Sequence, residues 1–138
     1  MRKITKVAQL VVTAPDRPGM LAELSGVLAR AGVNIDAFCA YSVGKTAIFY
    51  LICNNNKKAK LALTAEGWKV KEEEVVAVAL ENTKGALSKL AEKLKVNNIN
   101  LVYCYGSTSN TSCACLFVFK AVNNNKAIAA LKKRDSVL

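Results

Sequence analysis

The sequence contains no histidine. Histidine is the commonest general base in enzymes and the commonest metal ligand, so its absence argues against the most frequent kinds of catalytic and metal sites. The sequence also lacks an apolar run long enough to span a membrane. Its first residues, Met1 to Lys3, lead directly into an amphipathic strand pattern, without the apolar segment of a secretory leader. These absences lead us to expect a cytoplasmic protein.

Acidic residues are scarce: 10 Asp and Glu stand against 20 Lys and Arg, which gives a formal charge of +10. Such an excess permits binding to a polyanion such as nucleic acid or a membrane surface. Most lysines are scattered, with small clusters at 57–60 and 132–134, and scattered charge favours the alternative of an ordinary solvated surface. The five cysteines, an odd number within apolar strand-like runs, indicate reduced thiols.

The 138 residues suffice for one ordinary domain or two very small ones, and about half of them are apolar. Gly32 is expected to end a first helix, and Asn54 to Asn56 to cap a second. The first half therefore has the order βαββαβ. Its apolar periodicity predicts strands at 6–14, 33–41, 47–53 and 68–71 and helices at 18–31 and 56–65.

An internal duplication is the strongest feature of the sequence. Residues of the first half recur 66 positions later: Gly19 as Gly85, Leu21 as Leu87 and Asn34 as Asn100. A new strand at 75–80 begins the second half. Past the hairpins the offset is 69, so the second hairpin, at 107–112, carries about three extra residues. We expect two domains, 1–72 and 73–138, which are each too small to be stable without packing on the other.

Several predicted strands, such as 47–53, are apolar on both faces. A sheet with helices on one face only would alternate apolar and polar residues, so the second face must be covered by the other half, by another chain, or by both. We therefore predict a homodimer or higher oligomer. With the offset of 69, Trp68 corresponds to Val137. Either the last strand of the second half is a minimal one at 136–138, or another chain covers the open edge.

The loop from Asp16 to Leu21 lies between the first predicted strand and helix. Asp16 is expected to be the N-cap, and Pro18 suits the first helical turn. Gly19 lets a ligand approach the backbone closely. The free N–H groups and positive dipole end of such a helix start favour a carboxylate or phosphate. A capped helix start without a ligand is the alternative.

This pattern resembles an ACT domain, because Asp-Arg-Pro-Gly-x-Leu follows the first strand of a βαββαβ unit and Gly-Val-Asn-Ile-Asp opens the second. The whole chain resembles a small tandem ACT protein: an α+β fold of two ferredoxin-like units packed together, the second with a truncated last strand. The second half departs from the pattern at three positions: Asn82 replaces Asp16, Lys84 replaces Pro18 and Val102 replaces Asp36.

The resemblance implies a non-catalytic sensor of free amino acids that uses no cofactor and acts on a partner enzyme or regulator. The ligand would lie between two ACT units, with the loop of one facing the second strand of the other. One implied site combines Asp16, Arg17, Pro18, Gly19, Met20 and Leu21 with Asn100, Leu101 and Val102. The reciprocal site combines Asn82, Gly85, Ala86 and Leu87 with Asn34, Ile35 and Asp36.

Asp36 would pair with the ammonium of the ligand, and the loop N–H groups would take its carboxylate. Because Val102 stands where the second half should repeat Asp36, the two sites are expected to be unequal, with the Asp36 site occupied first. Alternatively, Asp36 is only a surface residue at a polar strand position.

Other functions stay open. RNA-recognition domains share this fold class, but the strand at 113–119 keeps only the aromatics of their pattern. Cys104, Cys113 and Cys115 could meet across a hairpin, although zinc usually needs four ligands and buried apolar cysteines are favoured. Arg17 could imitate the loop arginine of acylphosphatases, yet no base or nucleophile stands in a recognisable setting. A ligand-free oligomerisation module is the last alternative.

Overall fold

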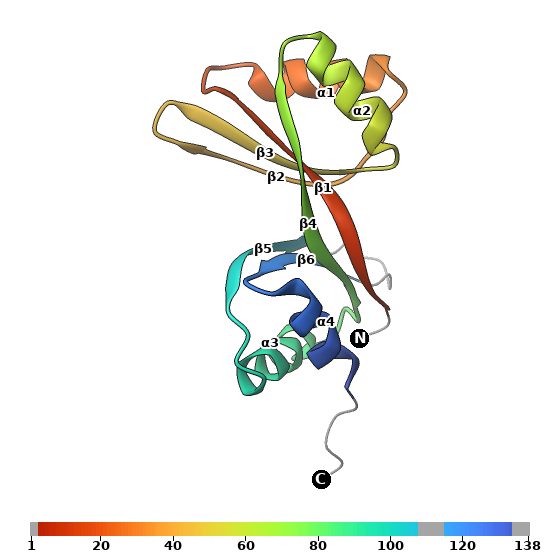
Figure 1. Ribbon diagram of the computed structural model, residues 1–138, viewed down its shortest axis with the longest axis vertical. Helices are drawn as coiled ribbons and strands as arrows, with labels where there is room; N and C mark the ends of the chain where they lie inside the picture. The colour runs from red at the N-terminus through yellow and green to blue at the C-terminus, as the bar shows by residue number, and fades with distance from the viewer. Residues whose placement is uncertain (1–2, 108–114, 134–138) are drawn as a thin grey trace. The chain divides into compact units, whose positions relative to one another are not determined.

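The computed structural model describes residues 3–107 and 115–133, which form the α+β fold predicted from the sequence (Figure 1). Contacts gather in two compact units: a first unit of residues 8–73, and a second unit of residues 1–7 and 74–138. No helix within 3–107 and 115–133 is long and apolar enough to cross a membrane. The elements are β1 (Lys3–Pro15), α1 (Met20–Arg30), β2 (Ile35–Val43), β3 (Thr46–Cys53), α2 (Asn56–Ala65), β4 (Lys69–Leu80), α3 (Ala86–Val96), β5 (Leu101–Ser107), β6 (Cys115–Ala121) and α4 (Asn124–Lys132).

In the first unit the strand order is β2-β3-β1-β4. β3 is antiparallel to both β1 and β2, and α1 and α2 cover one face of the sheet (Figure 1). The apolar spacing of α1 turns Leu24 and Leu28 toward this face. They join a core that also includes Leu10, Val12, Phe49, Leu51 and Leu63.

The second unit repeats this arrangement. Its strand order is β1-β4-β6-β5, with β6 antiparallel to both β4 and β5. Leu90 and Leu94 of α3 pack against Phe117 and Phe119 of β6. The position of β4 here is that of β1 in the first unit, as expected from the duplication.

Two strands are longer than the sequence predicted. β1 begins at Lys3 rather than at residue 6, and β4 unites the two strands predicted at 68–71 and 75–80. β1 and β4 are neighbours in the sheet, so each gives the other hydrogen-bond partners along its length. The acidic run at 72–74 therefore continues the strand instead of forming a connection.

The first part of β1, Lys3 to Val7, belongs to the second unit. There Ile4 packs against the core, the Thr5 hydroxyl lies 3.5 Å from the carbonyl oxygen of Ala77, and the Lys6 ammonium lies 3.6 Å from the Glu74 carboxylate. These residues form the edge strand of the second unit, next to β4. In the first unit β4 is the corresponding edge strand, next to β1. The predicted last strand at 136–138 lies outside the described residues, as does most of the hairpin predicted at 107–112. The units also differ from the predicted domains in their assignment of the first seven residues.

Two helix ends confirm their predicted sequence signals. The side-chain oxygen of Asn55 accepts a hydrogen bond from the Lys58 N–H at 3.0 Å and caps α2. At the end of α1, Gly32 has a φ of 73° and its N–H donates to the carbonyl oxygen of Ala29 at 3.0 Å. A left-handed glycine after the last turn is the usual helix stop.

Candidate functional site

The turn before α1 differs from its prediction. The N-cap is Gly19, with a φ of 90°, and α1 begins at Met20 rather than at residue 18. Asp16 does not cap the helix, because α1 has no side-chain cap. The backbone N–H of Asp16 instead donates to the carbonyl oxygen of Lys45 at 2.9 Å, beside the β2–β3 hairpin. A turn closed by the Met20 N–H and the Arg17 carbonyl, at 3.4 Å, separates Asp16 from the helix. The prediction of Asp16 as N-cap is therefore wrong.

This turn leaves donors at the helix start. No side chain caps α1, and the N–H groups of Leu21 and Ala22 have no hydrogen-bond partner within residues 3–107 and 115–133. The first intrahelical bond runs from the Glu23 N–H to the Gly19 carbonyl at 2.9 Å. Free N–H groups at the positive end of a helix dipole favour an anion. The start of α1 can therefore take a carboxylate.

A hollow of about 340 Å³ lies against this helix start. The side of the hollow away from the helix is formed by β2 and β3. The register between these strands pairs Ala40 with Phe49 and Ser42 with Ala47, and all four residues line the hollow. Five of the six predicted loop residues line the hollow, and Pro18 does not. The lining residues from the loop and from β2 are Asp16, Arg17, Gly19, Met20, Leu21, Ala40, Tyr41 and Ser42.

Tyr41 is held in position by Tyr50. Their hydroxyl oxygens share a hydrogen bond of 2.8 Å, and their rings meet edge to face with centroids 5.6 Å apart. Burial, and then the hydrogen bond with Tyr41, raise the pKa of Tyr50 far above its ordinary value. The pair therefore fixes the β2 side of the hollow.

The opposite end of β2 carries the predicted residues Asn34, Ile35 and Asp36. The Asn34 amide donates to the Asp36 carboxylate at 2.8 Å, and the Asn34 N–H donates to the side-chain oxygen of Asn54 at 2.9 Å. Ile35 packs against the core, whereas Asp36 is exposed. The Asp36 carboxylate is therefore oriented by a neighbour and still faces solvent.

Residues 8–65 match the family model of the ACT domain. The match covers most of the first unit. This confirms the resemblance carried by its loop and by the opening of its second strand.

Solved structures extend the comparison to both units. A protein from Bacteroides thetaiotaomicron is 27% identical, with 94% of this chain and 88% of that chain covered and a TM-score of 0.86. The regulatory subunit of aspartate kinase from Thermus thermophilus is 18% identical, with coverages of 94% and 95% and a TM-score of 0.66. The corresponding subunit from Thermus flavus is also 18% identical, with coverages of 93% and 94% and a TM-score of 0.58. No curated protein matches the chain. The second unit thus shares the fold of the ACT domain.

The helix start of the second unit has the same geometry as that of the first unit. α3 begins after Gly85, which has a φ of 84°, and again no side chain caps the helix. Asn82 and Leu87 are exposed and Ala86 is half-buried. The loop geometry is thus conserved between the two copies, although Asn82 and Lys84 depart from the sequence motif.

In the second strand of this unit, the Asn100 carbonyl accepts a hydrogen bond from the Val122 N–H at 3.1 Å. Leu101 packs against the core, while Val102 is 56% exposed. The predicted meeting of 16–21 with 100–102, and of 82–87 with 34–36, stays a prediction.

Sequence reasoning missed the β2 wall of the hollow, at 40–42. The strand order βαββ could have indicated this end of β2, because β1 and β2 are both antiparallel to β3 and so run in the same direction. The carboxyl end of β2 therefore lies at the same edge of the sheet as the loop after β1. The sequence did not reveal the register that selects these three residues.

The geometry also bears on the alternatives. Phe117 and Phe119 are only 7% and 0% exposed in the core, so they are not available to stack on bases. The Cys115 thiol donates to the carbonyl oxygen of Ser107 at 3.2 Å, Cys104 is exposed, and Cys113 lies outside the described residues. Within 3–107 and 115–133 there is no group of three or more potential metal ligands.

Cys53 is expected to react slowly with iodoacetamide at pH 8. Burial, and then the Asp36 carboxylate, raise the pKa of its thiol to about 11, so only about one molecule in a thousand carries a thiolate at this pH. Peptide mapping should show Cys53 labelled about 100-fold more slowly than the exposed Cys104, with a rate that rises as the pH increases toward 11. Equal labelling of the two thiols in the folded protein would contradict this environment.

Proposed function

We propose that the chain is a cytoplasmic regulatory module without catalytic activity, which binds a free amino acid at the loop from Asp16 to Leu21. The observation that carries the proposal is the coincidence of the uncapped α1 start with a hollow of about 340 Å³. Ligand pockets usually enclose about 300–1,000 Å³, so the hollow suits a small ligand. The ACT domain, and the fold shared with two regulatory subunits of aspartate kinase, support a regulatory role.

The hollow and the helix start beside it supply the three contacts that an amino acid needs. The N–H groups of Leu21 and Ala22 can donate to its carboxylate. The Asp16 carboxylate, which lines the same hollow, can accept from its ammonium. Ala40 and Phe49 give an apolar wall that would select among ligand side chains.

We also propose that the protein is a homo-oligomer that assembles along β2. This strand is at the edge of the first unit and leaves Phe38, Tyr41 and Val43 exposed by 54%, 42% and 59%. Exposed apolar edge strands readily pair with another chain. Because Tyr41 also lines the hollow, a second copy on β2 would change the environment of the ligand. Ligand binding would then shift the assembly equilibrium, which a partner enzyme or regulator would sense.

A thermal-shift screen of the twenty amino acids tests the proposal. A ligand at 100-fold above its dissociation constant should stabilise the protein by about 2.7 kcal/mol. Asp16→Asn should weaken binding about tenfold or more, because the ammonium loses its charged partner. Glu92→Gln removes the same charge from an exposed position in the second unit and should leave binding unchanged. Absence of a shift with all twenty amino acids would overturn amino-acid sensing.

Asp36→Ala compares the two candidate partners of the ammonium. The variant should retain the ligand if Asp16 is the partner. Loss of the shift in Asp36→Ala, with the shift retained in Asp16→Asn, would instead place the ligand at the opening of the second strand. That result would contradict the site proposed at the start of α1.

A further inference from the structure

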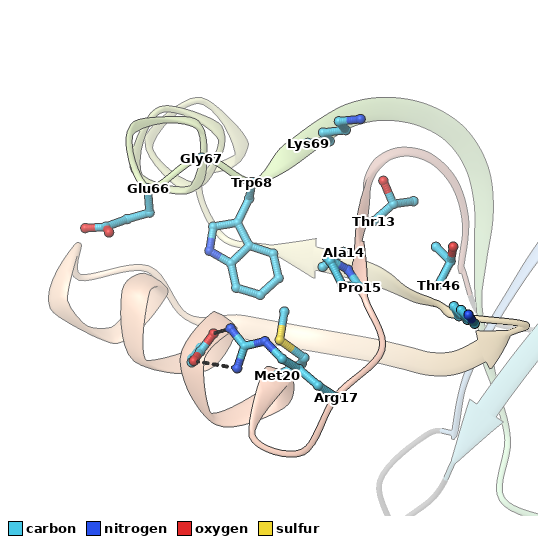
Figure 2. A pocket seen from close by; sticks show the side chains of 12 residues that line it. Thr13, Ala14, Pro15, Arg17, Met20, Thr46, Glu66, Gly67, Trp68 and Lys69 are labelled. Carbon is cyan, nitrogen blue, oxygen red and sulfur yellow. Dashed lines mark hydrogen bonds and ion pairs between the residues drawn. The ribbon is translucent and has the colours of Figure 1, made fainter.

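We propose that the first unit contains a second ligand site, which takes a monocarboxylate with an aromatic body. A hollow of about 620 Å³ lies between the end of β1, the start of α1 and the start of β4 (Figure 2). It shares Arg17 and Met20 with the smaller hollow, but it opens toward β4, whereas the smaller hollow is lined by β2. Its volume falls within the usual range of about 300–1,000 Å³ for ligand pockets and leaves room for a ring.

Trp68 gives this hollow an aromatic wall. Figure 2 shows its ring pointing from the start of β4 toward Met20 and Arg17 at the start of α1. The ring is held in place because it packs edge to face against Phe49, with centroids 6.3 Å apart and an interplanar angle of 79°. Indole and thioether groups both make favourable contacts with a flat ring. An aromatic ligand between Trp68 and Met20 would therefore bury its ring against pre-positioned side chains.

The charges at this hollow favour a single carboxylate. The Arg17 guanidinium donates to both oxygens of Glu23 at 3.2 and 3.1 Å, and a guanidinium has five N–H donors, so further donors remain. Lys45 and Lys69 also line the hollow, and neither has an ion-pair partner in the part of the chain that the structure describes. Together with the carboxylate of Glu66, the ionised lining has three positive and two negative groups. One excess positive charge matches a monoanion.

The described part of the second copy lacks these features. A hollow of about 180 Å³ lies at the corresponding position of the second unit, and the described residues that line it include no aromatic side chain. At the offset of 66 residues, Thr83 replaces Arg17 and Ala86 replaces Met20. The features that suit an aromatic acid are thus found in the first unit and not in the hollow of its repeat.

The test uses the fluorescence of Trp68, which is the only tryptophan in the chain. The probe is 3-phenylpropionate, compared with its neutral amide and with acetate. The acid should change the fluorescence saturably. The amide should bind at least about tenfold more weakly, and acetate alone should have no effect. Equal affinity for the acid and the amide, or no saturable change with the acid, would overturn the proposal.

Two matched variants locate the carboxylate. Arg17→Gln should weaken the binding of 3-phenylpropionate about tenfold, since it removes a charged donor. Arg30→Gln removes the same charge from an exposed position at the end of α1, outside the hollow, and should have no effect. Equal losses in the two variants would show a general charge effect and overturn the site.

Arg17 and Met20 line both hollows, and Asp16 is the residue that distinguishes this site from the amino-acid site. Asp16 lines the smaller hollow only, so Asp16→Asn should leave 3-phenylpropionate binding intact. Retained binding of the aromatic acid together with a failed amino-acid screen would overturn only the proposed function. The reverse result would overturn only this inference.

Discussion

Deletion of residues 1–7 is expected to destabilise the second unit by more than about 3 kcal/mol. These residues are distant in sequence from the rest of that unit, which begins at residue 74. The deletion removes the strand beside the last part of β4, where Thr5 lies next to Ala77, and takes Ile4 out of the core. A unit this small buries too little surface to lose an edge strand without a large loss of stability. Hydrogen exchange of the β6 and α4 amides should therefore accelerate by more than about 100-fold.

The comparison is a deletion of 134–138, which contains the stretch where the sequence alone predicted the last strand of this unit. The N-terminal deletion should have the larger effect on β6 and α4. A larger effect of the C-terminal deletion would contradict the assignment of Lys3 to Val7 to the second unit. The fluorescence of Trp68 reports separately on the first unit, whose part of β1 remains in both variants.

The elements that depend on local sequence could be predicted. The repeat predicted a helix after each of the glycines at 19 and 85, and each glycine does precede a helix of 11 residues, although their φ values of 90° and 84° and their N-cap positions were not predicted. Asn55 caps α2 through its own side chain. Each of these features depends on a few adjacent residues, so an internal repeat preserves it and makes it visible in the sequence.

The long strands could not be predicted in the same way. The three glutamates at 72–74 read as a connection, because nothing adjacent to them suggests a strand. Pairing of β4 with β1, which is distant in the sequence, provides the partners that keep this stretch extended. The same pairing extends β1 back to Lys3, and both differences therefore have one non-local cause.

Half of the candidate site was visible in the sequence. The loop motif predicted five residues that line the smaller hollow. The facing residues at 40–42 depend on the register between β2 and β3, which shifts between Ile35 and Ala37. A shift of one residue turns different side chains toward a site, and its position is not encoded in the alternation of apolar and polar residues. The sequence predicted Trp68 only as a strand residue, and its position facing Arg17 across the larger hollow follows from the fold (Figure 2).

Leu28→Ala is expected to destabilise the first unit by about 2–5 kcal/mol, because Leu28 is fully buried in its core and truncation leaves a cavity. Leu21→Ala, on the same helix, should change stability by no more than about 0.5 kcal/mol, since Leu21 is 47% exposed. Urea unfolding followed by Trp68 fluorescence measures both values. Leu28 belongs to the core of the first unit and Leu21 to the surface that lines the smaller hollow, so the pair separates these two contributions.

The same pair of variants tests whether this surface is free in solution. Leu21→Ala should weaken amino-acid binding while the fold stays intact, because Leu21 lines the hollow without joining the core. If Leu21→Ala lowered the free energy of unfolding by about 2 kcal/mol or more, Leu21 would be buried in the oligomer that forms in solution. If that loss became smaller on dilution, a second copy of the chain would be the group that covers it, because stability that comes from association depends on protomer concentration. Loss of stability independent of concentration would contradict the exposed position of Leu21.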